Sequence, residues 1–64
     1  MAKIGDKTTL KGETYEVTKV NVVENDGGVF EARAVLSGRR GRPTTGFGAT
    51  KSKAMASLDV KLGL

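Results

Sequence analysis

The sequence is 64 residues long, contains no cysteine and no histidine, and carries a formal net charge of +4. That length allows one domain, and the two absences exclude disulfides and the thiolate and imidazole ligands of most zinc sites. A core of this size supplies only about 3–5 kcal/mol of stability, so packing alone has to hold the fold. We therefore expect a single small domain over residues 1–64, with no metal site and no cofactor.

The apolar runs are all shorter than the roughly 18 residues needed to cross a bilayer. The start Met1-Ala2-Lys3 lacks the apolar segment of a secretory signal. The lack of cysteine is compatible with a reducing compartment. We expect no membrane partner and a cytoplasmic location.

The first third of the chain predicts two strands joined by a tight turn. Residues 4–12 are rich in threonine and predict a short edge strand with Leu10 as its main apolar anchor. Residues 11–13, Lys-Gly-Glu, suit a tight turn. The next run, residues 14–24, is dense in valine and favours a strand.

The apolar alternation of that second strand is interrupted. Tyr15 and Val17 fall on one face, whereas Val20 and Val22 fall on the other. A β-bulge near residues 18–19 would return all four side chains to one buried face, and we predict one there.

A hairpin and a regularly alternating strand follow. Residues 25–28, Asn-Asp-Gly-Gly, tolerate positive φ and give the strongest hairpin signal in the chain. The strand predicted over residues 29–37 contains two alanines that leave room for a helix to approach closely. Its buried face consists of Phe30, Ala32, Ala34 and Leu36.

The last third predicts a short strand and a helix. Pro43 restricts the strand at residues 44–47 to a sheet edge, because proline donates no ladder hydrogen bond. Thr50 suits a helix N-cap and Gly63 suits a left-handed C-terminal residue, so we predict a helix over about residues 50–62. The apolar stripe of this helix is Ala54, Met55, Leu58 and Leu62.

These elements together predict the fold class. Consecutive strands joined by short turns are usually neighbours in a sheet, and an amphipathic helix has to cover an apolar face. The sequence therefore predicts an α+β fold, an antiparallel meander of three or four strands within residues 8–47, with one C-terminal helix packed on one face.

Catalysis needs a poised acid or base, and without histidine the candidates are seven carboxylates, the lysines and one tyrosine. The carboxylates fall on predicted turns and strand edges, such as Glu24 and Asp26 at the hairpin, where we expect them to be solvated. No spacing pairs a serine or threonine with a lysine base. We predict no catalytic residue and no enzymatic activity.

The positive charge is concentrated in the C-terminal part of the chain. Residues 1–37 hold five basic and six acidic side chains, a net charge of −1, whereas residues 38–64 hold six basic side chains and one aspartate, a net charge of +5. Clustered charge creates a field that evenly spread charge does not. Most of these basic side chains lie in an arginine-rich turn and at the predicted helix start.

The lysines at the predicted helix start oppose the helix dipole. Lys51 and Lys53 occupy the first turn, where acidic side chains are favoured, and each lysine costs about 0.3–1 kcal/mol at low salt. The free N–H groups of a helix N-terminus between two lysines suit a phosphate. We therefore predict that Lys51, Ser52 and Lys53 bind phosphate; the alternative is that the lysines only keep the protein soluble.

The arginine-rich turn predicts further phosphate contacts. Arg39, Arg40 and Arg42 lie in residues 37–43, from which their guanidiniums can contact successive phosphates; the alternative is a solvated basic turn. The short strand separates the two basic groups by about 15 Å at ~3.4 Å per residue, or less if the turn folds back. Either spacing suits a nucleic-acid groove.

Phe47 lies between two glycines in the short strand. An exposed aromatic at this position would stack on a base. Because this small core has only two phenylalanines to draw on, we expect Phe47 to pack beneath the helix instead.

From Phe30 to Leu58 the sequence resembles the C-terminal half of a double-stranded-RNA-binding domain. An alternating strand, a turn and a short strand lead through Gly-Phe-Gly-Ala-Thr at residues 46–50 into Lys-Ser-Lys-Ala at residues 51–54. In that family a Ser/Thr-Lys-Lys-x-x-Ala helix start contacts phosphates across the major groove. The resemblance implies phosphate contacts at the helix start and packing of Ala54 on the sheet. The order of three strands and a helix also resembles AP2-like and arm-type DNA-binding domains, whose sheet enters the major groove.

The sequence therefore predicts a small non-enzymatic nucleic-acid-binding protein that contacts the phosphates of duplex RNA or DNA with little sequence readout. The alternative is a protein-interaction or inhibitor domain that docks an acidic partner protein or pairs its edge strand with another sheet. A homodimer through an edge strand is compatible with either function.

Overall fold

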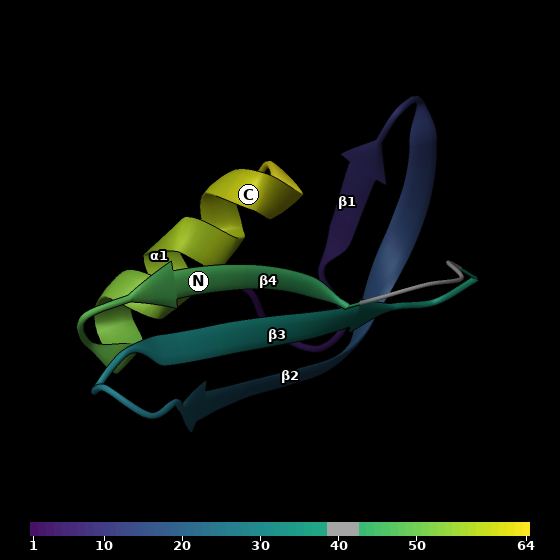
Figure 1. Ribbon diagram of the computed structural model, residues 1–64. Helices are drawn as coiled ribbons and strands as arrows, with labels where there is room; N and C mark the ends of the chain where they lie inside the picture. The colour runs from purple at the N-terminus through teal and green to yellow at the C-terminus, as the bar shows by residue number, and fades with distance from the viewer. Residues whose placement is uncertain (39–42) are drawn as a thin grey trace.

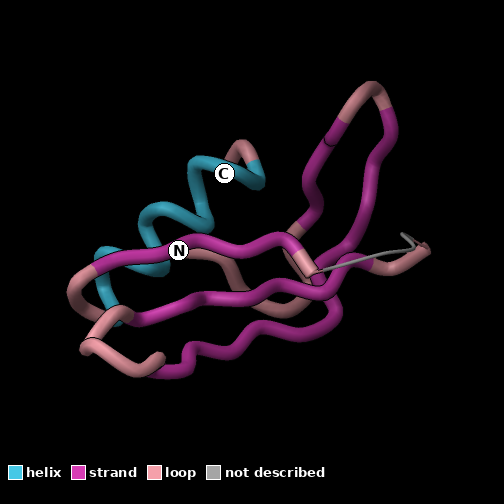
Figure 2. The backbone as a smooth tube through the Cα atoms, in the orientation of Figure 1, coloured by secondary structure: helices cyan, strands magenta, loops and turns pink. Residues whose placement is uncertain are grey.

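The computed structural model describes residues 1–38 and 43–64 (Figure 1). Within them, four strands form one antiparallel sheet in the order β1-β2-β3-β4, and the helix α1 packs on one face of it (Figure 2). The elements are β1 Lys7–Leu10, β2 Glu13–Glu24, β3 Phe30–Leu36, β4 Thr44–Gly48 and α1 Lys51–Leu62. The predicted α+β meander with one C-terminal helix is confirmed, and β4 is the edge strand that Pro43 required.

The two hairpin turns use residues with positive φ. Lys11 and Gly12, between β1 and β2, have φ of 52° and 83°. Two consecutive positive values match the right-handed twist of the flanking strands. Gly27 and Gly28 take φ of 88° and 79° between β2 and β3. Both turns lie where the sequence predicts them.

The predicted bulge in β2 is present. The register of β2 against β3 shifts between Val17 and Lys19, which leaves Thr18 as the extra residue. Val20 and Val22 therefore return to the face occupied by Val17. A bulge also bends its strand, and the hairpin of β1 with the first half of β2 turns away from β3 and β4 (Figure 1).

The hydrophobic core lies between the sheet and α1. The sheet contributes Val17, Ala32, Ala34 and Leu36. The helix contributes the stripe predicted from its spacing, Ala54, Met55, Leu58 and Leu62. The buried faces of β3 and α1 are thus the predicted ones.

The first strand is shorter than predicted and has a different anchor. It begins at Lys7 rather than near residue 4, because Gly5 takes φ 96° and the backbone N–H of Lys3 donates to the carboxylate of Asp6 in a turn. Thr8, at 4% exposure, is the buried residue of this strand, whereas the sequence predicts Leu10 in that role. The Thr8 hydroxyl donates to the carbonyl of a residue in the last turn of α1, Leu62.

Two glycines of β4 bring α1 directly onto the sheet. A Cβ atom placed on Gly46 would lie 2.3 Å from the backbone nitrogen of Leu58, and one on Gly48 would lie 2.5 Å from that of Ala54. The helix backbone therefore rests on β4 at a distance that no other residue type allows. This contact fixes the N-terminus of α1 beside the end of β4.

Both ends of α1 are capped as predicted. The Thr50 hydroxyl accepts a hydrogen bond from the Lys53 backbone N–H at 3.1 Å. Gly63 takes φ 73°, and its N–H donates to the carbonyls of Asp59 and Val60. No helix in residues 1–38 and 43–64 is long and apolar enough to cross a membrane.

Candidate nucleic-acid interface

The N-terminus of α1 presents unpaired backbone donors. The N–H groups of Lys53 and Ala54 both donate to Thr50, to its hydroxyl and its carbonyl. The N–H groups of Lys51 and Ser52 have no acceptor among the described residues. No acidic residue lies in the first turn, so the positive end of the helix dipole is not compensated there.

The side chains of this turn are exposed, at the positions predicted from the sequence. Lys51, Ser52 and Lys53 are all solvent-exposed, and in the described part of the chain neither lysine forms an ion pair. Residues two apart on a helix project about 200° from each other at 3.6 residues per turn. The two lysine side chains thus leave the first turn, which holds the free N–H groups, in different directions. We call this group, residues 51–53, the helix-start cluster.

The three predicted arginines, Arg39, Arg40 and Arg42, lie outside the described residues. The strand that follows them begins at Thr44 and ends at Gly48, a length of about 17 Å at ~3.4 Å per residue. The helix-start cluster lies beyond the far end of that strand. The predicted convergence of the two basic groups therefore stays a prediction.

The sheet face opposite α1 is uncovered by the described residues. The pairing of β2 with β3 and of β3 with β4 aligns the side chains of this face in two rows that cross these three strands. One row is Val23, Glu31 and Phe47, and the other is Asn21, Arg33 and Thr45. We call this surface, together with Lys19 and Val35, the open face.

The prediction that Phe47 packs beneath the helix is wrong. Its side chain is 49% exposed and belongs to the open face. Gly46 and Gly48 take the helix-facing positions of β4, and alternation along a strand then directs Phe47 to the opposite side. The two glycines flanking Phe47 were the sequence signal for this arrangement, since only glycine permits so close a helix.

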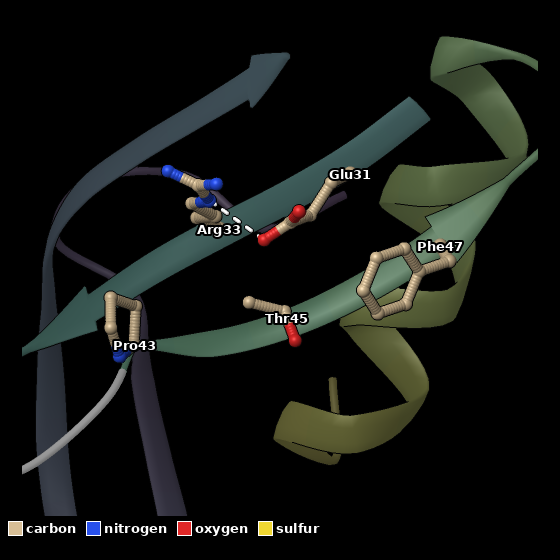
Figure 3. Close-up of a pocket in the computed structure, with 5 residues that line it drawn as sticks. All are labelled: Glu31, Arg33, Pro43, Thr45 and Phe47. Carbon is tan, nitrogen blue, oxygen red and sulfur yellow. Dashed lines mark hydrogen bonds and ion pairs between the residues drawn. The ribbon is translucent and has the colours of Figure 1, made fainter. Parts of the chain in front are cut away.

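Phe47 forms one wall of a hollow on the open face (Figure 3). The hollow has a volume of about 310 Å³, and its other lining residues are Glu31, Arg33, Pro43 and Thr45. Phe47 and Pro43 give it apolar ends, while Arg33 and Glu31 give it charge. The ammonium of Lys61, on α1, lies 5.9 Å from the centre of the Phe47 ring, within the range of a cation–π contact.

An ion pair fixes the charged part of this hollow. The Nε of Arg33 donates to Glu31 Oε2 at 2.7 Å (Figure 3). The side-chain amide of Asn25 donates to Glu31 Oε1 at 3.1 Å. The hydrogen bond from Arg33, followed by that from Asn25, lowers the pKa of Glu31, and the same pair raises the pKa of Arg33. The terminal nitrogens of Arg33 have no acceptor among the described residues, so they are available to a ligand.

The carboxylates of the described residues are not clustered. This part of the chain contains no group of three or more His, Cys, Asp or Glu side chains arranged to hold a metal ion. The exposed carboxylate of Glu13, at the start of β2, accepts a hydrogen bond from the hydroxyl of Tyr15 at 2.7 Å.

No family model, curated protein or solved structure matches the chain. The resemblance of residues 30–58 to a double-stranded-RNA-binding domain therefore stays a prediction from sequence.

Proposed function

We propose that this protein is a small nucleic-acid-binding domain in which the helix-start cluster binds duplex phosphates. The observation that supports this most strongly is the pair of free N–H groups at Lys51 and Ser52, flanked by two lysines with no acidic residue in the turn. A phosphate oxygen accepts hydrogen bonds from such N–H groups and gains from the dipole and from both ammonium groups.

The energetics of the helix argue in the same direction. Lys51 and Lys53 each destabilise the helix by about 0.3–1 kcal/mol at low salt, a cost that a bound anion would reverse. Lysines needed only for solubility could lie at almost any other exposed position, where they would not destabilise the helix. Sequence choices that oppose their own fold are frequently functional.

Phosphate contacts position a duplex without reading its sequence, so we expect RNA or DNA binding with little sequence preference from this cluster. Arg39, Arg40 and Arg42 are proposed as additional phosphate contacts that precede β4 in the chain. We propose no catalytic step, metal or cofactor.

Fluorescence anisotropy with labelled duplex RNA and duplex DNA, at about 50 mM and about 200 mM salt, tests the proposal. We expect affinity to fall steeply with salt. The single variants Lys51→Gln and Lys53→Gln should each flatten the slope of log affinity against log salt concentration by about one, and the double variant by about two. Lys7→Gln is the matched control, because it removes the same charge from β1, which contacts the other end of α1.

Two results would overturn the proposal. One is the absence of duplex binding at low salt. The other is an equal loss of affinity in Lys7→Gln and in either helix-start variant, which would mean that net charge alone attracts the duplex. Stoichiometric capture of an acidic protein, without nucleic-acid binding, would favour the alternative of a protein-interaction domain.

A further inference from the structure

The exposure of Phe47 needs an explanation, because this protein has few large apolar side chains to spare. Full burial of a phenylalanine contributes about 1.5–3 kcal/mol, a large share of the stability that a core this small supplies. The ring is nevertheless 49% exposed, on the edge strand β4. An aromatic ring held on a rigid strand in this way is a ready stacking platform.

The donors beside the ring are fixed in place. Glu31 holds Arg33 through Nε and is itself held by Asn25, so the terminal nitrogens of Arg33 are presented without a further acceptor among the described residues. Arg33 faces Thr45 across the strands, and Phe47 faces Glu31, which makes Arg33 and Phe47 diagonal neighbours. Diagonal neighbours lie roughly 7–8 Å apart, a span that one stacked purine bridges.

The chemistry of the hollow selects its occupant. A planar ring suits stacking on Phe47, and two adjacent acceptors on its edge suit the paired donors of a guanidinium. Lys61 supplies positive charge beside the Phe47 ring, and Lys19 lies on the same sheet face in β2, while the charge of Glu31 is neutralised by Arg33. Two copies of the protein placed face to face would bring these net positive surfaces together, which disfavours self-association.

We propose that the open face binds an unpaired base, with guanine preferred. The base stacks on Phe47, and its O6 and N7 accept hydrogen bonds from the terminal nitrogens of Arg33, the pairing that distinguishes guanine elsewhere. Glu31 is a positioning residue that orients Arg33. This inference rests on the proposed function, since the same nucleic acid supplies the base, but it concerns a different surface from the helix-start cluster.

The test is anisotropy with labelled uridine strands that carry one central guanine, adenine or 7-deazaguanine. We expect the guanine strand to bind about tenfold more tightly than the 7-deazaguanine strand, which lacks the N7 acceptor. Phe47→Ala should weaken binding of the guanine strand about tenfold, and Phe47→Tyr should retain it. Val60→Ala is the matched control, because it removes apolar surface from a side chain that is 79% exposed on α1.

Two further variants separate stacking from hydrogen bonding. Arg33→Lys keeps the charge but loses the paired donors, so we expect the guanine preference to disappear while the salt slope stays unchanged. Glu31→Gln should reduce the preference in the same way without changing the net binding of phosphates. Circular dichroism confirms that each variant folds, since all three positions lie outside the core.

The outcomes separate this inference from the proposed function. If Phe47→Ala binds the guanine strand like the wild type, the base platform is refuted and duplex binding by the helix-start cluster stands. If the Lys51 and Lys53 variants leave duplex binding intact while Phe47→Ala abolishes single-strand binding, the platform stands alone. A dimer in light scattering that Phe47→Ala dissociates would instead make the open face a self-association surface.

Discussion

The two faces of the sheet carry very different side chains on the same strands. The helix face of β3 and β4 carries small residues at its middle, Ala32, Ala34, Gly46 and Gly48, with Phe30 and Leu36 at the two ends of β3. The open face of the same strands carries larger polar and aromatic side chains, Glu31, Arg33, Thr45 and Phe47. The large buried side chains of the core therefore come mainly from α1, and where α1 crosses β3 and β4 the sheet supplies alanine and glycine.

This difference suggests how so short a chain combines stability with a binding surface. The small residues let the α1 backbone approach closely, so one helix closes one face. The opposite face is then left available for recognition. Substitutions on the helix face should therefore act mainly on stability, and those on the open face mainly on binding.

The largest contrast is expected between adjacent residues of β4. Gly46→Ala places a Cβ atom 2.3 Å from the backbone of Leu58, where no flexible side chain can give way. We expect a loss of about 3 kcal/mol or more, enough to unfold much of the protein. Thr45→Ala, on the open face, should change the free energy of unfolding by less than about 1 kcal/mol. Urea unfolding followed by circular dichroism measures both, and equal losses would remove the distinction between the faces.

A smaller effect is expected where β1 meets the end of α1. Thr8→Val keeps the shape of the side chain but removes the hydroxyl that donates to the Leu62 carbonyl. A buried carbonyl without its donor costs about 1–3 kcal/mol. The control is Thr9→Val, which alters only an exposed contact between hydroxyl groups. Thermal unfolding of the two variants should show a lower melting temperature for Thr8→Val alone.

The start of α1 should show opposite effects on stability and binding. Lys51→Gln removes a charge that opposes the helix dipole, so we expect unfolding to require about 0.3–1 kcal/mol more at low salt. Screening should abolish this gain at high salt. The same variant should bind duplexes more weakly. A variant that is less stable at low salt would contradict this account of the helix-start cluster.

The smallest effect concerns the ion pair on the open face. The pKa of Glu31 is lowered from its ordinary value of 4.5 by Arg33 and Asn25, so the folded protein binds this proton more weakly than the unfolded chain. The stabilisation is present above that value and is lost as the pH falls through the lowered folded pKa. The difference in melting temperature between the wild type and Glu31→Gln should therefore narrow below pH 4.5. If the melting temperatures of the wild type and Glu31→Gln differ by the same amount at neutral and at acidic pH, the ion pair does not stabilise the fold.

Features that depend on local patterns could be predicted from the sequence. The interrupted alternation around Thr18 gave the bulge, and Thr50 and Gly63 gave the limits of α1. Pro43 placed β4 at the sheet edge. Each of these follows from the backbone preferences of one or two neighbouring residues.

Features that depend on distant contacts could not be predicted in this way. Thr8 is buried because its hydroxyl meets a carbonyl 54 residues further along the chain. The outward position of Phe47 depends on which face of β4 the helix covers, and only the flanking glycines hint at it. Glu31 and Arg33 are two residues apart and so share a strand face, but their ion pair depends on side-chain geometry that the spacing does not give.

Backbone amide chemical shifts during titration with a short RNA duplex test the central claim most directly. We predict that the amide resonances of Lys51 and Ser52 shift most, because their N–H groups are free to donate to a phosphate. Their shifts should vanish in the double variant Lys51→Gln, Lys53→Gln. Saturating duplex that leaves these two amides unmoved would contradict phosphate binding at the start of α1.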